Sequence, residues 1–422
     1  MKIQINPGTA RGRVTAPPSK SMAHRMMICA GLAAGTSVLQ GISDSQDMQA
    51  TLDCLAALGA QWQKDGETVT ITGIGSARTA VHDDAGAAGT QTGEPVLRCR
   101  ESGSTLRFFI PICLQTGRRA QLVGAPRLME RPLQVYAQLC RERGLLFAQE
   151  RQTLTVQGPL PAGSYRLRGD ISSQFISGLL FGLPLCEGDS TVTILPPIES
   201  RPYIDMTLAA LKTFGVRAAW QDAQTLYIPG GQQYHACNAQ VEGDFSNAAF
   251  FGILDAIRPE NQVQIDGLPP AADSLQADCV YPALLARLDT PAPCIDLTDC
   301  PDLGPILFAA AAAKHGGRFV GTKRLKIKES DRGAAMAAEL RKCGVSVTVG
   351  EDEILVEPSA SGLQAPTVPL SGHNDHRIVM STAVLLTLTG GVIEGAEAVS
   401  KSFPDFFDKL QALGIEVKNI EN

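Results

Sequence analysis

A short polar or charged cluster that opens directly into an apolar run recurs six times along the chain. The clusters occupy residues 19–25, 101–107, 170–174, 244–247, 302–305 and 374–377. Ser, Asp, Asn and Gly favour helix starts, so each cluster predicts the N-terminal end of a buried helix. The first turn of a helix has unpaired, partly positive N–H groups, and three of the clusters add Lys or Arg. This arrangement is suited to bind phosphate and carboxylate groups.

A second helical pattern follows each cluster. The amphipathic stretches are residues 47–58, 132–143, 203–214, 332–343 and 405–413, each closed by Gly. A short β-like stretch follows four of them, at 60–62, 216–218, 345–349 and 415–417. The corresponding stretch of the fourth repeat, 278–288, has no closing Gly and is the least regular copy. Helices alternating with strands predict six α/β units, although six unrelated helix pairs on an ordinary mixed sheet remain an alternative.

The length of the chain predicts two domains with three repeats each. A chain of 422 residues exceeds one ordinary core, and domains of about 200 residues are typical. The stiff pair Pro17–Pro18 and the polar stretch 230–240 mark the crossings between domains. We therefore expect a discontinuous domain of residues 1–18 plus 241–422, which includes the first strand, and a second domain of residues 19–240. The ligand site is expected in the cleft between them.

Composition excludes several classes of protein. The net charge of −6 and the lack of a long basic run argue against a nucleic-acid surface. Eleven Cys without a CxxC pair indicate reduced thiols in a cytoplasmic protein rather than disulfides or a zinc site. Neither a signal-peptide core nor an apolar stretch approaching 18 residues is found, so no membrane span is expected.

Four segments, 18–25, 326–332, 374–377 and 401–405, carry more charge than a structural role explains. Lys20 and Arg25 both lie at the positive end of the first predicted helix, which is unfavourable unless an anion binds there. Solvated turns with internal ion pairs are the alternative for these segments. Asp302 has no cation near it in sequence, and it is suited either to cap a helix or to transfer a proton. No GxGxxG, Walker or GxSxG motif and no metal-ligand spacing is present.

Ten segments in order resemble the 5-enolpyruvylshikimate-3-phosphate synthase family of enolpyruvyl transferases. They are residues 19–25, 102–107, 126–132, 172–175, 201–205, 243–244, 301–302, 328–332, 375–377 and 401–405, which span essentially the whole chain. The resemblance implies an α/β fold, a two-domain inverse α/β barrel in which each domain is built of three βαβαββ units. The chain departs from the common pattern at Glu101, where many members have Asn, and at Arg324 and Lys326.

The resemblance also implies a reaction. The family transfers the enolpyruvyl group of phosphoenolpyruvate to the 5-hydroxyl of shikimate 3-phosphate, through a tetrahedral intermediate and with release of phosphate, in the shikimate pathway. It implies no cofactor and no metal, two small-molecule substrates as partners, and neither nucleic acid nor membrane. We expect a cytoplasmic monomer. We also expect glyphosate to inhibit, because Gly103 would leave room beside Lys20 and Arg127.

Site residues follow from the same resemblance. Asp302 is expected to act as base toward the 5-hydroxyl, and Glu329 to donate a proton to carbon, with Lys20 sharing the acid role. Expected around phosphoenolpyruvate are Lys20, Gly103, Arg127, Gln174, Arg332, Arg377 and Lys401. Expected around shikimate 3-phosphate are Lys20, Ser21, Arg25, Ser172, Ser173, Gln174, Ser200, Asp302 and Lys328, with Tyr203 at the border.

Two other functions stay open. A UDP-N-acetylglucosamine enolpyruvyl transferase would share the fold, but it usually carries a reactive Cys in a mobile loop, and Cys113 does not lie in such a context. A non-catalytic anion-binding protein is the other alternative. The retained Asp302 and Glu329 argue against it, because binding anions gains nothing from extra carboxylates.

Overall fold

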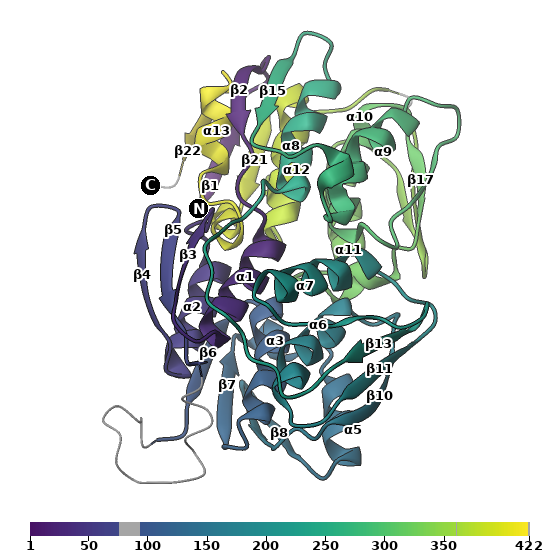
Figure 1. The fold of residues 1–422 in the computed structure, drawn as a ribbon. Coiled ribbons are helices and arrows are strands. Elements are labelled where there is room, and N and C mark those ends of the chain that lie inside the picture. The colour runs from purple at the N-terminus through teal and green to yellow at the C-terminus, as the bar shows by residue number, and fades with distance from the viewer. Residues whose placement is uncertain (76–92, 360, 421–422) are drawn as a thin grey trace. The chain divides into compact units, whose positions relative to one another are not determined.

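The computed structural model describes residues 1–75, 93–359 and 361–420 and divides into two compact units (Figure 1). Unit 1 comprises Met1–Ser19 and Glu242–Asn422, and unit 2 comprises Lys20–Val241. Unit 2 is therefore continuous in sequence, whereas unit 1 is assembled from both ends of the chain.

Unit 2 contains three four-stranded sheets among its described residues, ordered β14-β3-β5-β4, β6-β7-β9-β8 and β10-β11-β13-β12. Its strands are β3 (Thr36–Gln40), β4 (Gln61–Asp65), β5 (Thr68–Thr72), β6 (Val96–Arg100), β7 (Ala120–Gly124), β8 (Leu146–Glu150), β9 (Thr153–Gln157), β10 (Gly163–Arg168), β11 (Ser190–Leu195), β12 (Ala219–Trp220), β13 (Thr225–Ile228) and β14 (Ala239–Gln240). Its helices are α1 (Lys20–Leu32), α2 (Gln46–Ala57), α3 (Gly103–Gln115), α4 (Pro126–Met129), α5 (Gln134–Glu142), α6 (Ser173–Gly182) and α7 (Arg201–Thr213).

Unit 1 contains, in its described part, two four-stranded sheets, β20-β21-β1-β22 and β16-β17-β19-β18, and the pair β15-β2. Its strands are β1 (Lys2–Ile5), β2 (Arg11–Thr15), β15 (Gln262–Asp266), β16 (Cys294–Asp296), β17 (Gly317–Val320), β18 (Val347–Val349), β19 (Glu353–Val356), β20 (Leu370–Ser371), β21 (Gly391–Glu394) and β22 (Val417–Asn419). Its helices are α8 (Phe245–Ala256), α9 (Tyr281–Arg287), α10 (Gly304–Ala313), α11 (Arg332–Lys342), α12 (His376–Thr389) and α13 (Phe406–Ala412).

Each complete repeat follows one plan. Two parallel strands are joined through a helix, and an antiparallel hairpin completes the sheet, as in β6, β7, β8 and β9. Two sheets include a strand from a distant part of the sequence. The sheet of β3 is completed by β14 from the end of unit 2, and the last sheet of unit 1 receives β1, which lies between β21 and β22.

The fourth repeat is shorter than the others. Its strands β2 and β15 pair in parallel, but within the described residues no hairpin extends them. After α9 the segment 288–293 leads directly into β16, which already belongs to the next sheet. This is the repeat that lacks a closing Gly in the sequence, so the irregular pattern reflects a missing hairpin.

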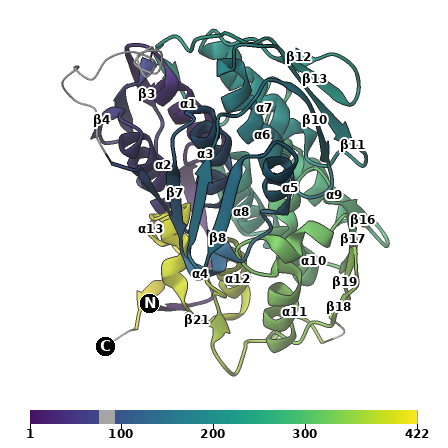
Figure 2. The same cartoon turned by 90° about the horizontal axis from the view of Figure 1, so that it is seen from below.

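The two helices of each repeat differ in how much of their surface is buried. The first helices, such as α6 and α10, are buried on almost every side, whereas second helices such as α2 and α7 bury one face. Strands alternate between buried and more exposed residues, as β7 and β11 do. Figure 2 shows α10 and α11 beside the sheet of β16, β17, β18 and β19. Because apolar helices fill the interior of each unit and the sheets lie outside, the expected inverse α/β fold is confirmed.

Most helix boundaries agree with the sequence patterns. Ser102, Asp244 and Asp375 accept hydrogen bonds from backbone N–H groups at the starts of α3, α8 and α12. The closing glycines Gly215 and Gly344 have φ of 75° and 77°, as left-handed C-caps require. The strand expected at residues 216–218 instead begins at Ala219.

Cysteine pairing and helix length bear on two expectations from composition. None of the eleven cysteines, all of which lie in the described residues, forms a disulfide. In the described part of the chain, no helix is long and apolar enough to cross a bilayer.

Close packing of α3 against α6 gives the first prediction. A methyl group on Gly178 would lie 2.2 Å from the Tyr136 Oη atom and 2.7 Å from the Arg107 carbonyl oxygen. Gly178→Ala should therefore lower the free energy of unfolding by about 1–3 kcal/mol in urea titrations. Gly93→Ala, whose added methyl meets open space, is the control, and equal stability of the two variants would contradict the packing argument.

Candidate functional site

The start of α1 carries the first expected cation. Lys20 is the first residue of α1, and its Nζ atom lies 2.6 Å from Oδ2 of Asp47 in the first turn of α2. Both side chains are largely buried, so the carboxylate holds the ammonium group in place. Asp47 was missed in the sequence, because an acidic residue in the first turn of a helix is common for structural reasons alone.

The starts of α3 and α6 lie side by side in unit 2 (Figure 1). Gln174 Nε2 donates to Ser104 Oγ at 2.9 Å, and Arg107 Nη1 donates to Gln174 Oε1 at 2.7 Å. Ser172 caps α6 by accepting the Gln174 N–H, and the neighbouring Ser173 is buried. These contacts bring together the predicted residues Ser172, Ser173 and Gln174, with Gly103 at the start of α3.

Gly103 lies against a residue to which the sequence assigned no role. A Cβ atom at this position would lie 2.6 Å from Nη1 of Arg131. The missing side chain therefore makes room for the buried Arg131 guanidinium, a residue that lies in a matched segment but was not assigned a role. Arg127, on α4, is half exposed and pairs with Glu130 at 3.4 Å.

Arg25 is buried and connects two helices. Its Nε donates to Thr207 Oγ1 at 2.8 Å, its Nη2 to the Tyr203 carbonyl at 2.8 Å, and its Nη1 to the Ser21 carbonyl at 2.6 Å. Burial lowers the pKa of Arg25 to about 10. Most of its hydrogen-bonding capacity is thus used to join α1 to α7. The predicted Ser200 precedes α7, is buried, and has a φ of 56°.

In unit 1, Asp302 lies among three cations. Its Oδ1 accepts from Arg332 Nη1 at 2.8 Å and from Lys328 Nζ at 3.1 Å, and its Oδ2 accepts from Arg377 Nη2 at 3.2 Å. Asp302 lies in the short 3-10 helix η5 (Pro301–Leu303), and α10 has no side-chain cap. Helix capping therefore does not explain Asp302.

Arg332 joins the carboxylates of this cluster. Besides Asp302, its Nη2 donates to Glu329 Oε2 at 2.8 Å and its Nε to Asp375 Oδ2 at 2.9 Å. The Arg332 side chain is 2% exposed and that of Asp375 is 0% exposed. Lys401, at the end of η7 (Ala396–Lys401), donates to the Asn374 carbonyl at 2.6 Å, beside Asp375 in sequence.

The charges of this cluster shift several pKa values. Burial would raise the pKa of Asp302, but Arg377, Lys328 and Arg332 outweigh it and leave the pKa well below its ordinary value. Burial lowers the pKa of Lys328 to about 8, although Asp302 opposes the shift. Asp302 is therefore ionised near neutral pH, and Lys328 titrates close to it.

Four cations and three carboxylates meet in unit 1. The cations are Lys328, Arg332, Arg377 and Lys401, and the carboxylates are Asp302, Glu329 and Asp375. The surplus of positive charge is suited to an anion. Asp278 is a further buried carboxyl that the sequence did not reveal, and burial followed by the charge of Asp302 raises its pKa to about 7.

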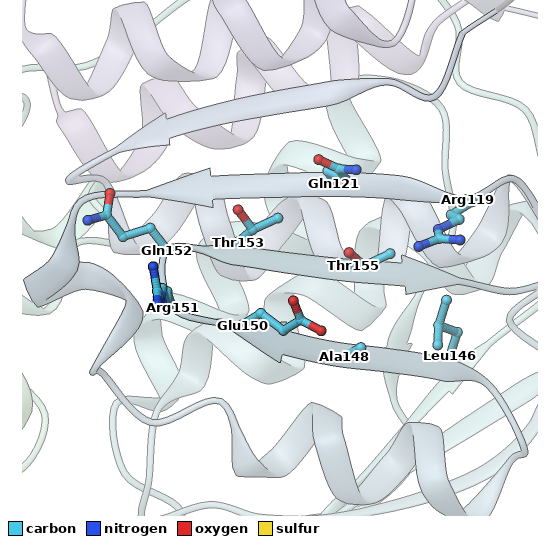
Figure 3. Close-up of a pocket in the computed structure, with 9 residues that line it drawn as sticks. All are labelled: Arg119, Gln121, Leu146, Ala148, Glu150, Arg151, Gln152, Thr153 and Thr155. Carbon is cyan, nitrogen blue, oxygen red and sulfur yellow. The ribbon is translucent and has the colours of Figure 1, made fainter.

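An open hollow of about 780 Å³ lies elsewhere on unit 2 (Figure 3). Its floor is one face of β7, β8 and β9, where Gln121, Thr153 and Thr155 are half-buried and Glu150 is exposed. None of the predicted site residues lines it. The predicted acid and base, Asp302 and Glu329, lie in the charged cluster and not in this hollow.

Loss of the Asp375 carboxylate should be costly. Asp375→Ala would leave the buried Arg332 with one anionic partner fewer, so the free energy of unfolding should fall by about 3–5 kcal/mol. Chemical denaturation measures this. Glu353→Gln removes the exposed pair of Glu353 with Arg318 and should change nothing measurable. Equal stability of the Asp375 variant and the unaltered protein would refute the role of Asp375 as a structural counter-ion.

Comparisons with known proteins show which family this chain belongs to. The family profile described as EPSP synthase (3-phosphoshikimate 1-carboxyvinyltransferase) matches residues 5–289 and 285–410. A 3-phosphoshikimate 1-carboxyvinyltransferase of Clostridium botulinum (strain Alaska E43 / Type E3) is 37% identical over 435 residues, covering 98% of this chain and 97% of the relative. One of Clostridium kluyveri is 35% identical, with 98% of each covered. The structure of EPSP synthase from Acinetobacter baumannii superposes with a TM-score of 0.76 at 25% identity, covering 99% of this chain and 100% of that one. The chain belongs to the EPSP synthase family, as its ordered motifs indicated.

Proposed function

We propose that this chain is a 3-phosphoshikimate 1-carboxyvinyltransferase, which moves the enolpyruvyl group of phosphoenolpyruvate to the 5-hydroxyl of shikimate 3-phosphate. The observation that carries the proposal is Asp302, whose two carboxylate oxygens lie among Lys328, Arg332 and Arg377. Glu329 shares Arg332 with it, so two carboxyl groups lie close to one set of cations. Full-length similarity to relatives of that name supports the same reaction.

Both substrates are anions that need several cations. One cation 4 Å from one anion contributes about 4 kcal/mol at an effective dielectric near 20. We assign phosphoenolpyruvate to Lys20, Gly103, Arg127, Gln174, Arg332, Arg377 and Lys401. We assign shikimate 3-phosphate to Lys20, Ser21, Arg25, Ser172, Ser173, Gln174, Ser200, Asp302 and Lys328.

The carboxylates keep these cations in place before substrate binds. Asp47 holds Lys20 at 2.6 Å and Asp302 holds Arg332 at 2.8 Å, close to the distances of charge-assisted hydrogen bonds. Substrate phosphate and carboxylate groups would then meet side chains that are already oriented. Such pre-organisation lowers the cost of binding and of charge development in the transition state.

Addition would begin with two proton transfers. Asp302, which is ionised, accepts the proton of the 5-hydroxyl as its oxygen bonds to C2 of phosphoenolpyruvate. Glu329 acts here in its protonated form, with Oε2 accepting from Arg332 and the proton on Oε1. It gives this proton to C3, with Lys20 sharing the role, and C3 becomes a methyl group. The tetrahedral adduct then loses phosphate as a methyl proton returns to Glu329, and the proton on Asp302 leaves with phosphate. Both carboxyl groups are thereby restored.

The acceptor is proposed to be shikimate 3-phosphate rather than UDP-N-acetylglucosamine. The thiol that an enolpyruvyl transferase of the second type would need should be exposed in a loop. Cys113 is instead buried in α3. The expected monomeric state and cytoplasmic location stay predictions.

A phosphate-release assay tests the function. Phosphate should appear only with phosphoenolpyruvate and shikimate 3-phosphate together, and not with UDP-N-acetylglucosamine as acceptor. Glu329→Gln removes the proton donor and should lower kcat by about 10²–10⁴-fold with little change in shikimate 3-phosphate binding by calorimetry. Release with the nucleotide sugar would contradict the assigned acceptor, and near-normal turnover of Glu329→Gln would contradict the assigned acid.

Lys328 should make substrate binding depend on pH. Its pKa of about 8 means that the ammonium form is lost as pH rises through that value. Because the charged form binds anions, KM for shikimate 3-phosphate should increase above pH 8, by up to about tenfold per pH unit. Lys328→Arg stays charged and should lack this increase, which steady-state kinetics across pH can detect. The same increase in that variant would assign the titration to another group.

A further inference from the structure

Glu339 is a buried carboxylate that the proposed reaction does not use. It lies on α11, and its side chain is 2% exposed. Its Oε2 accepts from the Ser371 N–H at 2.9 Å and from Lys342 Nζ at 2.7 Å, and its Oε1 lies 2.7 Å from His373 Nε2. Burial would raise the pKa of Glu339, but the hydrogen bonds from His373, Lys342 and Ser371 outweigh it and lower the pKa. The group is therefore an anion, and His373 donates to it through Nε2–H.

The segment that Glu339 holds is a strained turn. His373 and Asn374 have φ of 48° and 51°, so two successive residues with side chains adopt the left-handed conformation. Within the turn, the His373 N–H donates to Ser371 Oγ at 3.2 Å, and the Asp375 N–H donates to the Gly372 carbonyl at 2.9 Å. Such a conformation persists only when surrounding contacts impose it, and Glu339 makes two of those contacts.

The positions of three parts of the charged cluster depend on this turn. Asp375, the next residue, accepts from Arg332, and Arg377 in the first turn of α12 donates to Asp302. The carbonyl of Asn374, inside the turn, accepts from Lys401 at 2.6 Å. A change in the turn would move the partners of Arg332 and Lys401 and the backbone of Arg377 together.

Helix α11 contacts this region at two places. Arg332 is its first residue and Glu339 follows seven residues later, which is about two turns and about 10 Å along the same side of a helix. The first contact binds Asp375 directly, and the second binds the turn before it. Two separated attachments to one rigid helix fix both the position and the direction of the chain entering α12.

We propose that Glu339, acting through His373 and the Ser371 N–H, is a positioning residue that orients Arg377, Asp375 and the Lys401 acceptor for phosphoenolpyruvate. The inference rests on the proposed function, because it assigns Glu339 to the phosphoenolpyruvate side of that site. Glu339 itself need not touch substrate. Of the residues assigned to shikimate 3-phosphate, Asp302 and Lys328 belong to the charged cluster but lie outside this turn, and the others belong to unit 2. KM for phosphoenolpyruvate should therefore respond more than KM for shikimate 3-phosphate.

His373→Ala is the principal test variant, because the His373 side chain is 32% exposed and its removal leaves no buried gap. We expect KM for phosphoenolpyruvate to rise about tenfold or more, while KM for shikimate 3-phosphate stays within about twofold. Glu339→Gln keeps an acceptor for the Ser371 N–H, so its effect should be smaller than that of Glu339→Ala. Lys342→Met is the matched control. The Lys342 side chain is 29% exposed, lies outside the turn and is another partner of Glu339. Its removal should leave both KM values within about twofold of those of the unaltered protein.

The outcomes separate the inference from the function on which it rests. Unchanged KM values in His373→Ala and Glu339→Gln, with an active parent protein, would overturn the positioning role and leave the function intact. A lower kcat with both KM values unchanged would indicate fewer folded molecules and would also overturn it. A parent protein that releases no phosphate from the two substrates would refute the proposed function, and this inference with it.

Discussion

The organisation of unit 1 depends on one buried guanidinium. Arg332 binds Asp302, Glu329 and Asp375 at once, and these carboxylates come from η5, from the segment before α11 and from the start of α12. A buried charge is tolerated only when it is fully paired, so the three segments cannot separate without a large energetic cost. The same requirement that stabilises the fold places two carboxyl groups and several cations within reach of one small ligand.

Burying a charged cluster of this kind lowers the free energy of unfolding. Lys328 is held at a pKa of about 8 by burial, so part of the folding free energy is spent on keeping a cation away from water. Asp302 offsets this by binding Lys328, Arg332 and Arg377 together. The cations therefore stay oriented in the absence of substrate, and an incoming anion competes with an existing carboxylate rather than with bulk solvent.

Local sequence predicted the helices well and the partners of side chains poorly. The starts of α3, α8 and α12 carry capping residues whose effect is local, and Gly344 ends α11 by its own conformation. The roles of Asp47 and Glu339 depend on contacts with residues 27 and 34 positions away, which local spacing does not encode. Ordered motifs gave the family, and with it Asp302 and Glu329, whereas spacing alone left Asp302 between a helix cap and a proton acceptor. The contact of Gly103 with Arg131 could not be predicted from local sequence either, because it depends on how two segments pack.

The place of β1 in the last sheet of unit 1 constrains the order of folding. β1 pairs with β21 and β22, which follow it in sequence only after the whole of unit 2. Unit 2 is continuous and holds all strands of its own sheets, so it can complete its core during synthesis. The last sheet of unit 1 can close only after β21 and β22 have been synthesised, so its long-range pairing forms later than the local contacts of unit 2.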